Sequence, residues 1–402
     1  MISGTERKRL MNEGPARRTN TVMFFLLAAG SLTWNFGFSV YRGIWSNFLY
    51  EVHGILPNQL GLLESIREIP GLVTVFIVVL VAGLAPSVVS GLSCLAMGVG
   101  MMIYPFAHGL GQLIAVTVLF STGFHMLYPP QNTLVLYHAA PGEKGRWLGW
   151  MDAVGSAASL LAMVVVAALV ARLGFSGMFF VGAAAAGIAA VILFSTPGPR
   201  RMTTGTKALN IKRQYVTYYV MTLLQGARRH FFLVFALYNL VVHGVPTSTI
   251  AIMQGISYAA SMVTRPYLGR LADRFGEVNV QRWCYVLTGL VFTGYAFVDN
   301  LPVLYVLYTL DSILNFELII TLYAYTVARE SEVASALSGG STIGHITGVL
   351  VPATGGLIWK YAGHTATFLT GTALCLIGFV YALWLGRVIA RREAAASAPT
   401  AS

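Results

Sequence analysis

The chain has 402 residues, of which 56% are hydrophobic and only 10% are charged, and it carries a formal net charge of +11. A water-soluble protein has about 25% charged residues, so this composition excludes an ordinary soluble protein and predicts an all-α polytopic membrane protein. The three cysteines lie in apolar segments without a CxxC or Cys/His spacing, so they predict neither disulfides nor a metal site.

Long apolar segments follow one another along the chain, and many approach the ~20 residues that cross a bilayer as an α-helix. The longest connector, 196–213, is polar and contains Pro197 and Pro199, and it divides the segments into six and six. The twelve predicted helices cover residues 21–50, 58–81, 87–106, 110–138, 148–172, 175–195, 214–242, 247–272, 279–298, 302–328, 335–360 and 364–387. The predicted organisation is a tail 1–20, a six-helix bundle 21–195, a linker 196–213, a second six-helix bundle 214–387 and a tail 388–402.

Basic residues concentrate on one side of this predicted topology. Arg17, Lys212 and Arg391 belong to the basic segments, whereas the alternate loops hold little more than Arg172 and Lys360. By the positive-inside rule, both termini and the linker are cytoplasmic, as expected of a multi-pass protein of the plasma (inner) membrane. This placement accounts for the positive charge without a nucleic-acid partner. The N-terminal tail has no short apolar region with a cleavage site, so no signal peptide is expected. We also expect the protein to be a monomer.

The two predicted bundles repeat one another at a spacing of about 190 residues. Val52-His53-Gly54-Ile55 after the first helix matches Val242-His243-Gly244-Val245 after the seventh. The tight connector at Gly174 matches the one at Gly363. Similarities that recur at nearly one offset indicate a duplicated six-helix unit.

Three motifs point to one family. Residues 269–276, Gly-Arg-Leu-Ala-Asp-Arg-Phe-Gly, form a charged loop between the eighth and ninth predicted helices. Residues 140–149 form a basic, glycine-containing connector after the fourth helix, and residues 348–356 read Gly-x-x-x-Pro-x-x-Gly-Gly. In these motifs, and over nearly its whole length, the chain resembles the major facilitator superfamily. The resemblance implies two six-helix halves that rock around a central cavity.

The resemblance also implies a cytoplasmic gate at Gly269, Asp273 and Arg274, with a charged loop that serves topology alone as the other interpretation. The chain departs from the family in three places, one of which is Glu277, where a basic residue usually follows the loop motif. The loop 83–87 lacks the charged motif usual between the second and third helices, and 116–120 lacks the helix 4 arginine of many proton-coupled exporters. The resemblance therefore does not extend to typical drug exporters.

Ionisable residues occur within eight of the predicted helices and are absent from the apolar stretches of the third, sixth, ninth and twelfth. A charge that faces lipid is costly, and in the resembled fold every third helix lies outside, so this segregation favours charges that face a cavity or a seam. The candidate substrate-binding residues are Arg42, Arg67, His125, Arg228, Arg229, Glu317 and His345. The candidate proton-coupling residues are Glu64, Glu68, Asp311 and Glu317, and Asp152 is a further candidate for a gate.

Glu64, Arg67 and Glu68 have i, i+3 and i+4 spacing, so they share one face of the second helix. A carboxylate held by Arg67 can lose its partner and accept a proton when the cavity changes side. A permanent structural ion pair near Pro70 is the alternative. His125 and His345 can titrate or bind substrate, or they are packed hydrogen-bond donors.

Arg228 and Arg229 are consecutive, so they lie about 100° apart around the seventh helix and cannot face the same point. We expect one of them, Arg228 in the first instance, to face the cavity as an anion-binding guanidinium. The other is expected to pair with Glu317 or Asp311. Internal neutralisation of both arginines is the alternative.

These patterns predict a proton-coupled secondary active transporter, a symporter or antiporter, for a small polar or anionic solute. No G-x-x-x-x-G-K-[ST] motif for ATP is present, no cofactor is expected, and no nucleophile–base constellation suggests an enzyme. An exporter of amphipathic compounds is a rival, because 22 Phe, 19 Tyr and 14 Met suit an adaptable pocket. A transition-metal or metal-chelate carrier and a membrane sensor without transport are further alternatives.

Overall fold

The computed structural model describes residues 21–202, 212–314, 316–329 and 332–397, and in these ranges the regular secondary structure is entirely helical. Proline at the first helical position starts α3 and α4, where the missing N–H has no partner to lose. The elements are α2 (Thr21–Asn47), η1 (Phe48–Val52), α3 (Pro57–Leu80), α4 (Pro86–Ile103), η2 (Tyr104–Phe106), α5 (Gly109–His138), α6 (Lys144–Phe194), η3 (Arg213–Tyr215), α7 (Val216–Phe231), η4 (Phe232–Ala236), α8 (Leu237–Val242), α9 (Thr247–Phe275), α10 (Glu277–Phe297), α11 (Leu301–Ile313), α12 (Glu317–Val327) and α13 (Val333–Ser397).

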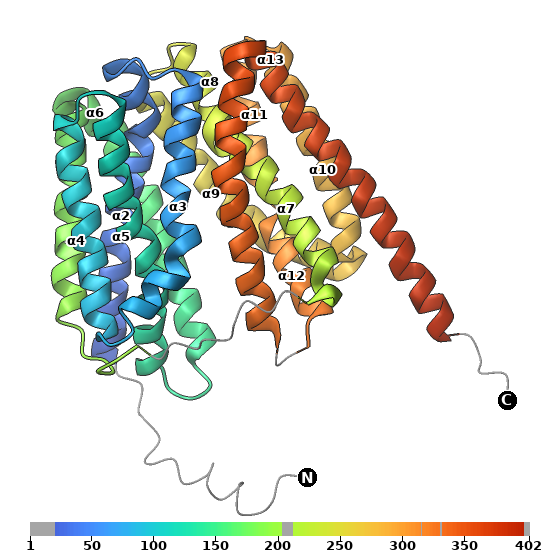
Figure 1. Cartoon of the computed structure of the whole chain (residues 1–402), viewed down its shortest axis with the longest axis horizontal. Helices are drawn as coiled ribbons and strands as arrows, with labels where there is room; N and C mark the ends of the chain where they lie inside the picture. The colour runs from blue at the N-terminus through green and yellow to red at the C-terminus, as the bar shows by residue number, and fades with distance from the viewer. Residues whose placement is uncertain (1–20, 203–211, 315, 330–331, 398–402) are drawn as a thin grey trace, which may run out of the picture.

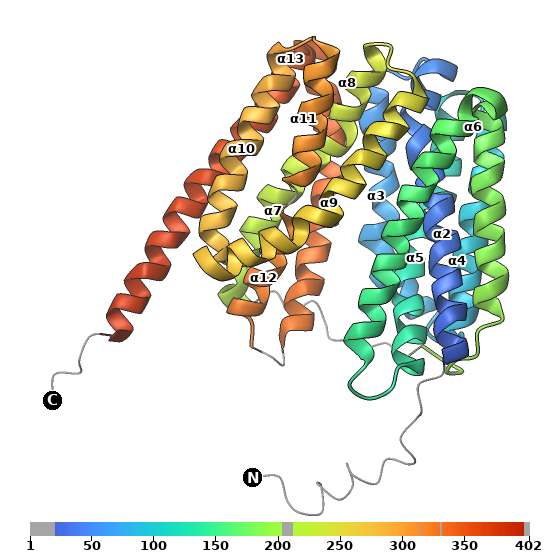
Figure 2. The ribbon, with the colours of Figure 1, turned by 180° about the vertical axis from the view of Figure 1, so that it is seen from behind.

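The two longest elements each contain a pair of membrane segments. Gly174 in α6 has φ 64° and Gly363 in α13 has φ 83°, a backbone conformation that glycine adopts without steric cost. At these glycines the chain turns back sharply, as both views of α13 show (Figures 1 and 2). With each pair counted as two segments, every one of the twelve predicted spans is helical in the part of the chain that the structure describes. Six elements are long and apolar enough to qualify as spans by length and composition alone.

Two predicted helices differ from the uniform segments expected. The span predicted at 214–242 contains a π-helical turn, η4, between α7 and α8. The span predicted at 302–328 is divided into α11 and α12, so Glu317 stands at the start of a helix rather than within one. Both irregularities fall beside ionisable residues, as is common at functional sites in membrane helices.

The helices form two bundles (Figure 1). The N-terminal bundle contains α2–α6, in which α2 and α4 pack on α6 and α4 packs on α5. The C-terminal bundle contains α7–α13, in which α7 and α10 pack on α13. The start of α2 and the end of α13 lie at the same end of the molecule, which we call the terminal end (Figure 1). The other end is called the distal end.

The bundles meet along a seam between α3 and α13, and α9 packs on α2 and α6. Near the distal end the seam is tight, because a side chain on Gly61 would collide with the carbonyl oxygen of Pro352 and one on Gly356 would lie 2.5 Å from that of Pro57. The Ala353 N–H donates to Ser65 Oγ across the seam at 2.9 Å. These backbone contacts close the distal end.

Candidate functional site

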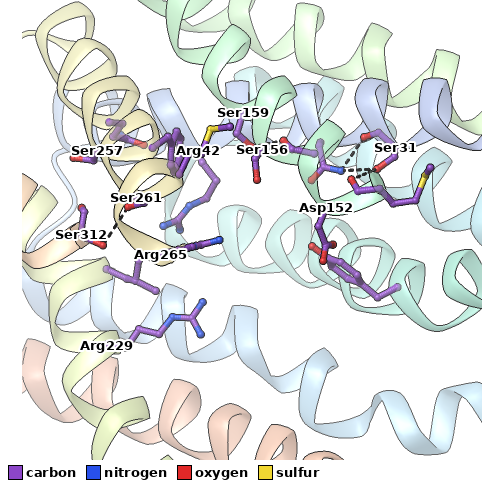
Figure 3. A pocket seen from close by; sticks show the side chains of 18 of the residues that line it. Ser31, Arg42, Asp152, Ser156, Ser159, Arg229, Ser257, Ser261, Arg265 and Ser312 are labelled. Atoms are coloured by element: carbon purple, nitrogen blue, oxygen red, sulfur yellow. Dashed lines mark hydrogen bonds between the residues drawn. The ribbon is translucent and has the colours of Figure 1, made fainter. Parts of the chain in front are cut away.

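A central cavity of about 720 Å³ lies between the two bundles. Residues from α2, α5 and α6 form one wall, and residues from α7, η4, α9 and α11 form the other (Figure 3). A second cavity of about 520 Å³ shares Ser156, Met262 and Arg265 with the first and extends to Gly269 and Asp273 near the end of α9. The central cavity therefore continues toward the terminal end.

Arginines dominate the charge of the central cavity. Arg42, Arg228, Arg229 and Arg265 line it, whereas Asp152 supplies the single carboxylate among the described lining residues. The side chains of Arg42, Arg229 and Arg265 project into a common space, with Asp152 across the cavity from them (Figure 3). Arg42, Asp152 and Arg265 therefore border the same space.

The two consecutive arginines of α7 have different partners. Arg228 is fully buried and forms an ion pair with the buried Asp311 of α11. Arg229 pairs with Glu317 at 2.9 Å, and these side chains are 40% and 56% exposed. Arg228, the arginine expected to face the cavity, lines it but is neutralised by Asp311, and Arg229 is the more accessible of the two. Both arginines are therefore paired, which is the alternative that the sequence left open.

Buried hydrogen-bonding groups surround the arginines. Gln254 Nε2, Ser257 Oγ and Arg228 Nη2 are buried and have no hydrogen-bond partner among the described residues. A buried polar group without a partner is costly, so these donors favour a ligand rich in acceptor atoms. On the opposite wall, the Asn35 side-chain amide donates to the Ser31 carbonyl at 2.8 Å (Figure 3).

The polar face of α9 was not predicted from the sequence. Gln254, Ser257, Ser261 and Arg265 line the cavity at spacings of three, four and four residues. That is the spacing of one helical face, so this pattern was the available signal. The uncharged residues of this face were not among the residues predicted from the sequence.

The predicted gate residues lie at the terminal end of the cavity. Gly269 and Asp273 line its outer part. The guanidinium of Arg270 lies over the ring of Tyr267, and that of Arg274 lies over the ring of Phe275. No ion pair of Asp273 is found in the described part of the chain.

A second polar cluster lies in the seam, away from the central cavity. Arg67 Nε lies 2.9 Å from Glu64 Oε2, and Arg67 Nη2 lies 2.8 Å from Glu68 Oε1. Glu68 Oε2 faces His345 Nδ1 at 3.1 Å and His125 Nε2 at 3.7 Å. None of these five residues is among those that line the central cavity. We call Glu64, Arg67, Glu68, His125 and His345 the seam cluster.

The seam cluster joins elements that are distant in sequence. Glu64, Arg67 and Glu68 come from α3 and His125 from α5, whereas His345 comes from α13 in the other bundle. Trp45 Nε1 of α2 donates to Glu64 Oε1 at 2.8 Å, so the second oxygen of that carboxylate is also bonded. The cluster is thus a connected network in which Glu64, Arg67 and Glu68 are buried and each of their charges has a partner.

The chain matches the Major Facilitator Superfamily over residues 26–326 and 218–401. No curated protein matches it significantly. Its structure is similar to that of the nucleoside transporter NupG, with a TM-score of 0.74 and 15% identity, over 91% of this chain and 99% of that one. It is also similar to a bacterial homologue of the lysosomal transporter Spinster in an inward-facing, unoccupied state, with a TM-score of 0.75 and 13% identity, over 93% of this chain and 98% of that one.

A third similar structure is a bacterial homologue of the iron transporter ferroportin, with a TM-score of 0.72 and 15% identity, over 91% of this chain and 99% of that one. At these identities the likeness shows the fold. The fold, the apolar helices and the motif loops agree with one another: the chain is a multi-pass membrane transport protein and belongs to the Major Facilitator Superfamily.

Proposed function

We propose that the protein is a secondary active transporter that carries a small polar anion by alternating access, coupled to protons. The observation that carries this proposal is the excess of arginine over carboxylate in the central cavity. A volume of about 720 Å³ is in the range of small-molecule sites, which extends from about 300 to 1,000 Å³.

The pairing of the arginines indicates which of them bind the anion. The charges of Arg228 and Arg229 are balanced by Asp311 and Glu317, respectively. The two other arginines of the cavity, Arg42 and Arg265, share only the carboxylate of Asp152 among the described lining residues. A guanidinium offers a planar fork of donors that suits a carboxylate or a phosphate. Arg42 and Arg265 are therefore the primary anion contacts in this proposal.

The exposed pair of Arg229 and Glu317 supplies a means of coupling. A substrate anion that approaches Arg229 competes with Glu317 for the same guanidinium. In this proposal Glu317 carries the proton once the substrate anion has taken its place at Arg229. Anion and proton then cross together, which makes symport the expected direction of coupling. Glu64, Glu68 and Asp311 are further proton-coupling candidates.

Alternating access needs one closed end and one open end. The glycine contacts at Gly61 and Gly356 close the distal end, and the cavity reaches Gly269 and Asp273 at the terminal end. With both termini in the cytoplasm, as the basic residues predict, this arrangement is the inward-open state. Asp152 on α6 and Arg265 on α9 carry opposite charges on the two bundles, so they are suited to meet when the terminal end closes.

An exporter of amphipathic compounds is a second candidate. Trp34, Tyr128, Tyr258 and Tyr308 line the same cavity and provide apolar surface with a polar edge. If the protein is such an exporter, the affinity for an amphipathic compound depends on these aromatic rings and does not change when Arg42 is replaced.

Transport is tested in proteoliposomes that enclose a pH-sensitive dye. Phosphate, succinate, gluconate and ethanesulfonate are added outside in turn, with valinomycin and potassium to clamp the membrane potential. An anion that is carried with a proton acidifies the lumen in liposomes with the protein and not in protein-free liposomes. Arg42→Gln should abolish this signal, whereas Arg172→Gln, an exposed arginine outside the cavity, should retain it. Acidification that persists in Arg42→Gln would contradict the proposed anion site, and solute flux without any proton movement would contradict the coupling.

A further inference from the structure

The seam cluster contains three metal-type donor groups, of which the two histidines have no role in the proposed transport cycle. We propose that Glu68, His125 and His345 bind a divalent transition-metal ion such as Zn²⁺, which bridges the two bundles and holds the seam closed. One carboxylate oxygen and one nitrogen from each imidazole all lie within 4.8 Å of one another. Two histidines and one carboxylate are a common donor set for Zn²⁺ and neighbouring metals.

The distances fit a shared ion. Glu68 Oε2 lies 3.1 Å from His345 Nδ1 and 3.7 Å from His125 Nε2. Ligands placed about 2.1 Å from one ion are separated by roughly 3.0 Å in octahedral and 3.4 Å in tetrahedral geometry. Binding therefore requires the two imidazole nitrogens, which lie within 4.8 Å of each other, to approach to about this separation.

The hydrogen bonds of His125 orient its free nitrogen toward the carboxylate. His125 Nδ1 lies 2.9 Å from the Ser121 carbonyl oxygen, which only accepts, so Nδ1 carries the hydrogen. The lone pair of Nε2 then faces Glu68 Oε2. A metal ion between these two atoms would satisfy both of them when the imidazole is neutral. A histidine ligand whose other ring nitrogen donates to a backbone carbonyl is the usual arrangement around bound metals.

The rest of the cluster supports a cation. Arg67 Nη2 fixes the other oxygen of Glu68, and the same guanidinium is shared with Glu64. Two carboxylates face one guanidinium, so the cluster has a net charge of −1 when its histidines are neutral. His230 of α7 is a further titratable group close to the cluster, since a methyl group on Gly348 would lie 3.0 Å from its ring and 2.7 Å from Glu68 Cγ.

The ligands come from both bundles, so a bound ion fastens α3 and α5 to α13. A side chain on Gly71 would lie 2.5 Å from the ring of His345 and 2.6 Å from that of His125, so glycine at this position allows the rings to converge. The His345 side chain is 26% exposed, which provides access for the ion. Since the cluster does not line the central cavity, the ion is a lock on the closed seam rather than the transported solute.

Binding is tested with purified, tag-free protein, Co²⁺ and Zn²⁺. Co²⁺ should give the visible absorption of a protein-bound site, and Zn²⁺ in about 100-fold excess over its Kd should raise Tm by about 2–5 °C. His345→Asn should weaken Zn²⁺ binding at least about tenfold. His108→Asn removes an exposed histidine outside the cluster and should leave binding unchanged. Equal loss in both variants, or binding that survives in His345→Asn and His125→Asn, overturns the site.

The lock is tested separately through the rate at which the seam opens. In a background without the three buried cysteines, Ser65→Cys places a thiol in the closed seam. Zn²⁺ should slow maleimide labelling of this cysteine severalfold, and His345→Asn should remove the effect. Zn²⁺ binding without slower labelling would overturn the bridging role. Neither experiment uses a transport substrate, so their failure is distinct from failure of the proposed anion transport.

Discussion

The ion pair between Arg228 and Asp311 allows a quantitative test of the two arginines on α7. Both side chains of this pair are at most 1% exposed, so removal of Arg228 leaves a carboxylate in an apolar interior. Loss of one partner of a buried pair costs about 3–5 kcal/mol. Arg228→Met should therefore destabilise the protein by about that amount. Arg229→Met, which breaks a half-exposed pair, should cost about 0–1 kcal/mol.

The double variant Arg228→Met/Asp311→Leu isolates the charge from the loss of packing. Replacement of a whole buried pair by apolar residues is often neutral, so the double variant should recover most of the stability that Arg228→Met loses. The assay is thermal and denaturant unfolding of the purified protein in detergent, with size-exclusion chromatography to check the fold. Equal destabilisation by Arg228→Met and Arg229→Met, or no recovery in the double variant, would refute the structural assignment of Arg228.

Three further perturbations follow from the structure. Gly71→Ala should destabilise the protein by about 1–3 kcal/mol, because the added methyl group clashes with two imidazole rings. Gly149→Ala should not destabilise it, because a methyl group there meets nothing within 4 Å. Equal melting temperatures of the two variants would contradict the packing described for the seam. Glu317→Gln should retain anion binding and lose proton movement, and an unchanged proton flux would exclude Glu317 from coupling. Outside the membrane, hydrogen bonds from Lys212 and Tyr215 lower the pKa of Glu332 below its ordinary value of 4.5. Its contribution to stability is therefore present above pH 4.5 and is lost as the pH falls through the lowered pKa. The wild type should have a higher free energy of unfolding than Glu332→Gln above pH 4.5 and lose this difference only in the acidic range. A difference that stays constant with pH would contradict this.

The fold was largely predictable because the bilayer imposes length and polarity on each span. Apolar segments separated by short connectors marked the helices, and the glycines at 174 and 363 marked two tight turns, both of which have positive φ. The π-helical turn η4 and the break before Glu317 were not predicted, because they interrupt apolar stretches whose composition does not change.

The identities of the buried charges were predictable, but their partners were not. The spacing of Glu64, Arg67 and Glu68 predicted a shared face, and the structure shows the two ion pairs that such a face allows. The meeting of His345 with this face depends on contact between α3 and α13, which local spacing does not encode. The choice of Asp311 as partner of Arg228 has the same origin, because it depends on the rotation of α7 against α11.

The polar residues of the cavity were hidden for a different reason. Serine, asparagine and glutamine on a membrane helix are common in packing interfaces, so their presence alone does not indicate a cavity. Only the register of Gln254, Ser257, Ser261 and Arg265 on one face of α9 distinguishes them. Charged residues within the apolar segments were the stronger signal in this sequence. They included residues of both the cavity and the seam cluster, but they did not show that these are two separate sites.

The central claim is that the cavity binds an anion through arginine, and calorimetric titration of the purified protein tests it most directly. Phosphate and succinate are titrated beside succinamide, an uncharged analogue of succinate. We predict that an anion binds, that succinamide does not, and that Arg42→Gln weakens the anion at least about tenfold while Arg172→Gln does not. The account would be contradicted if neither anion bound and if uncharged or cationic amphipathic compounds bound to the wild type and to Arg42→Gln with the same affinity.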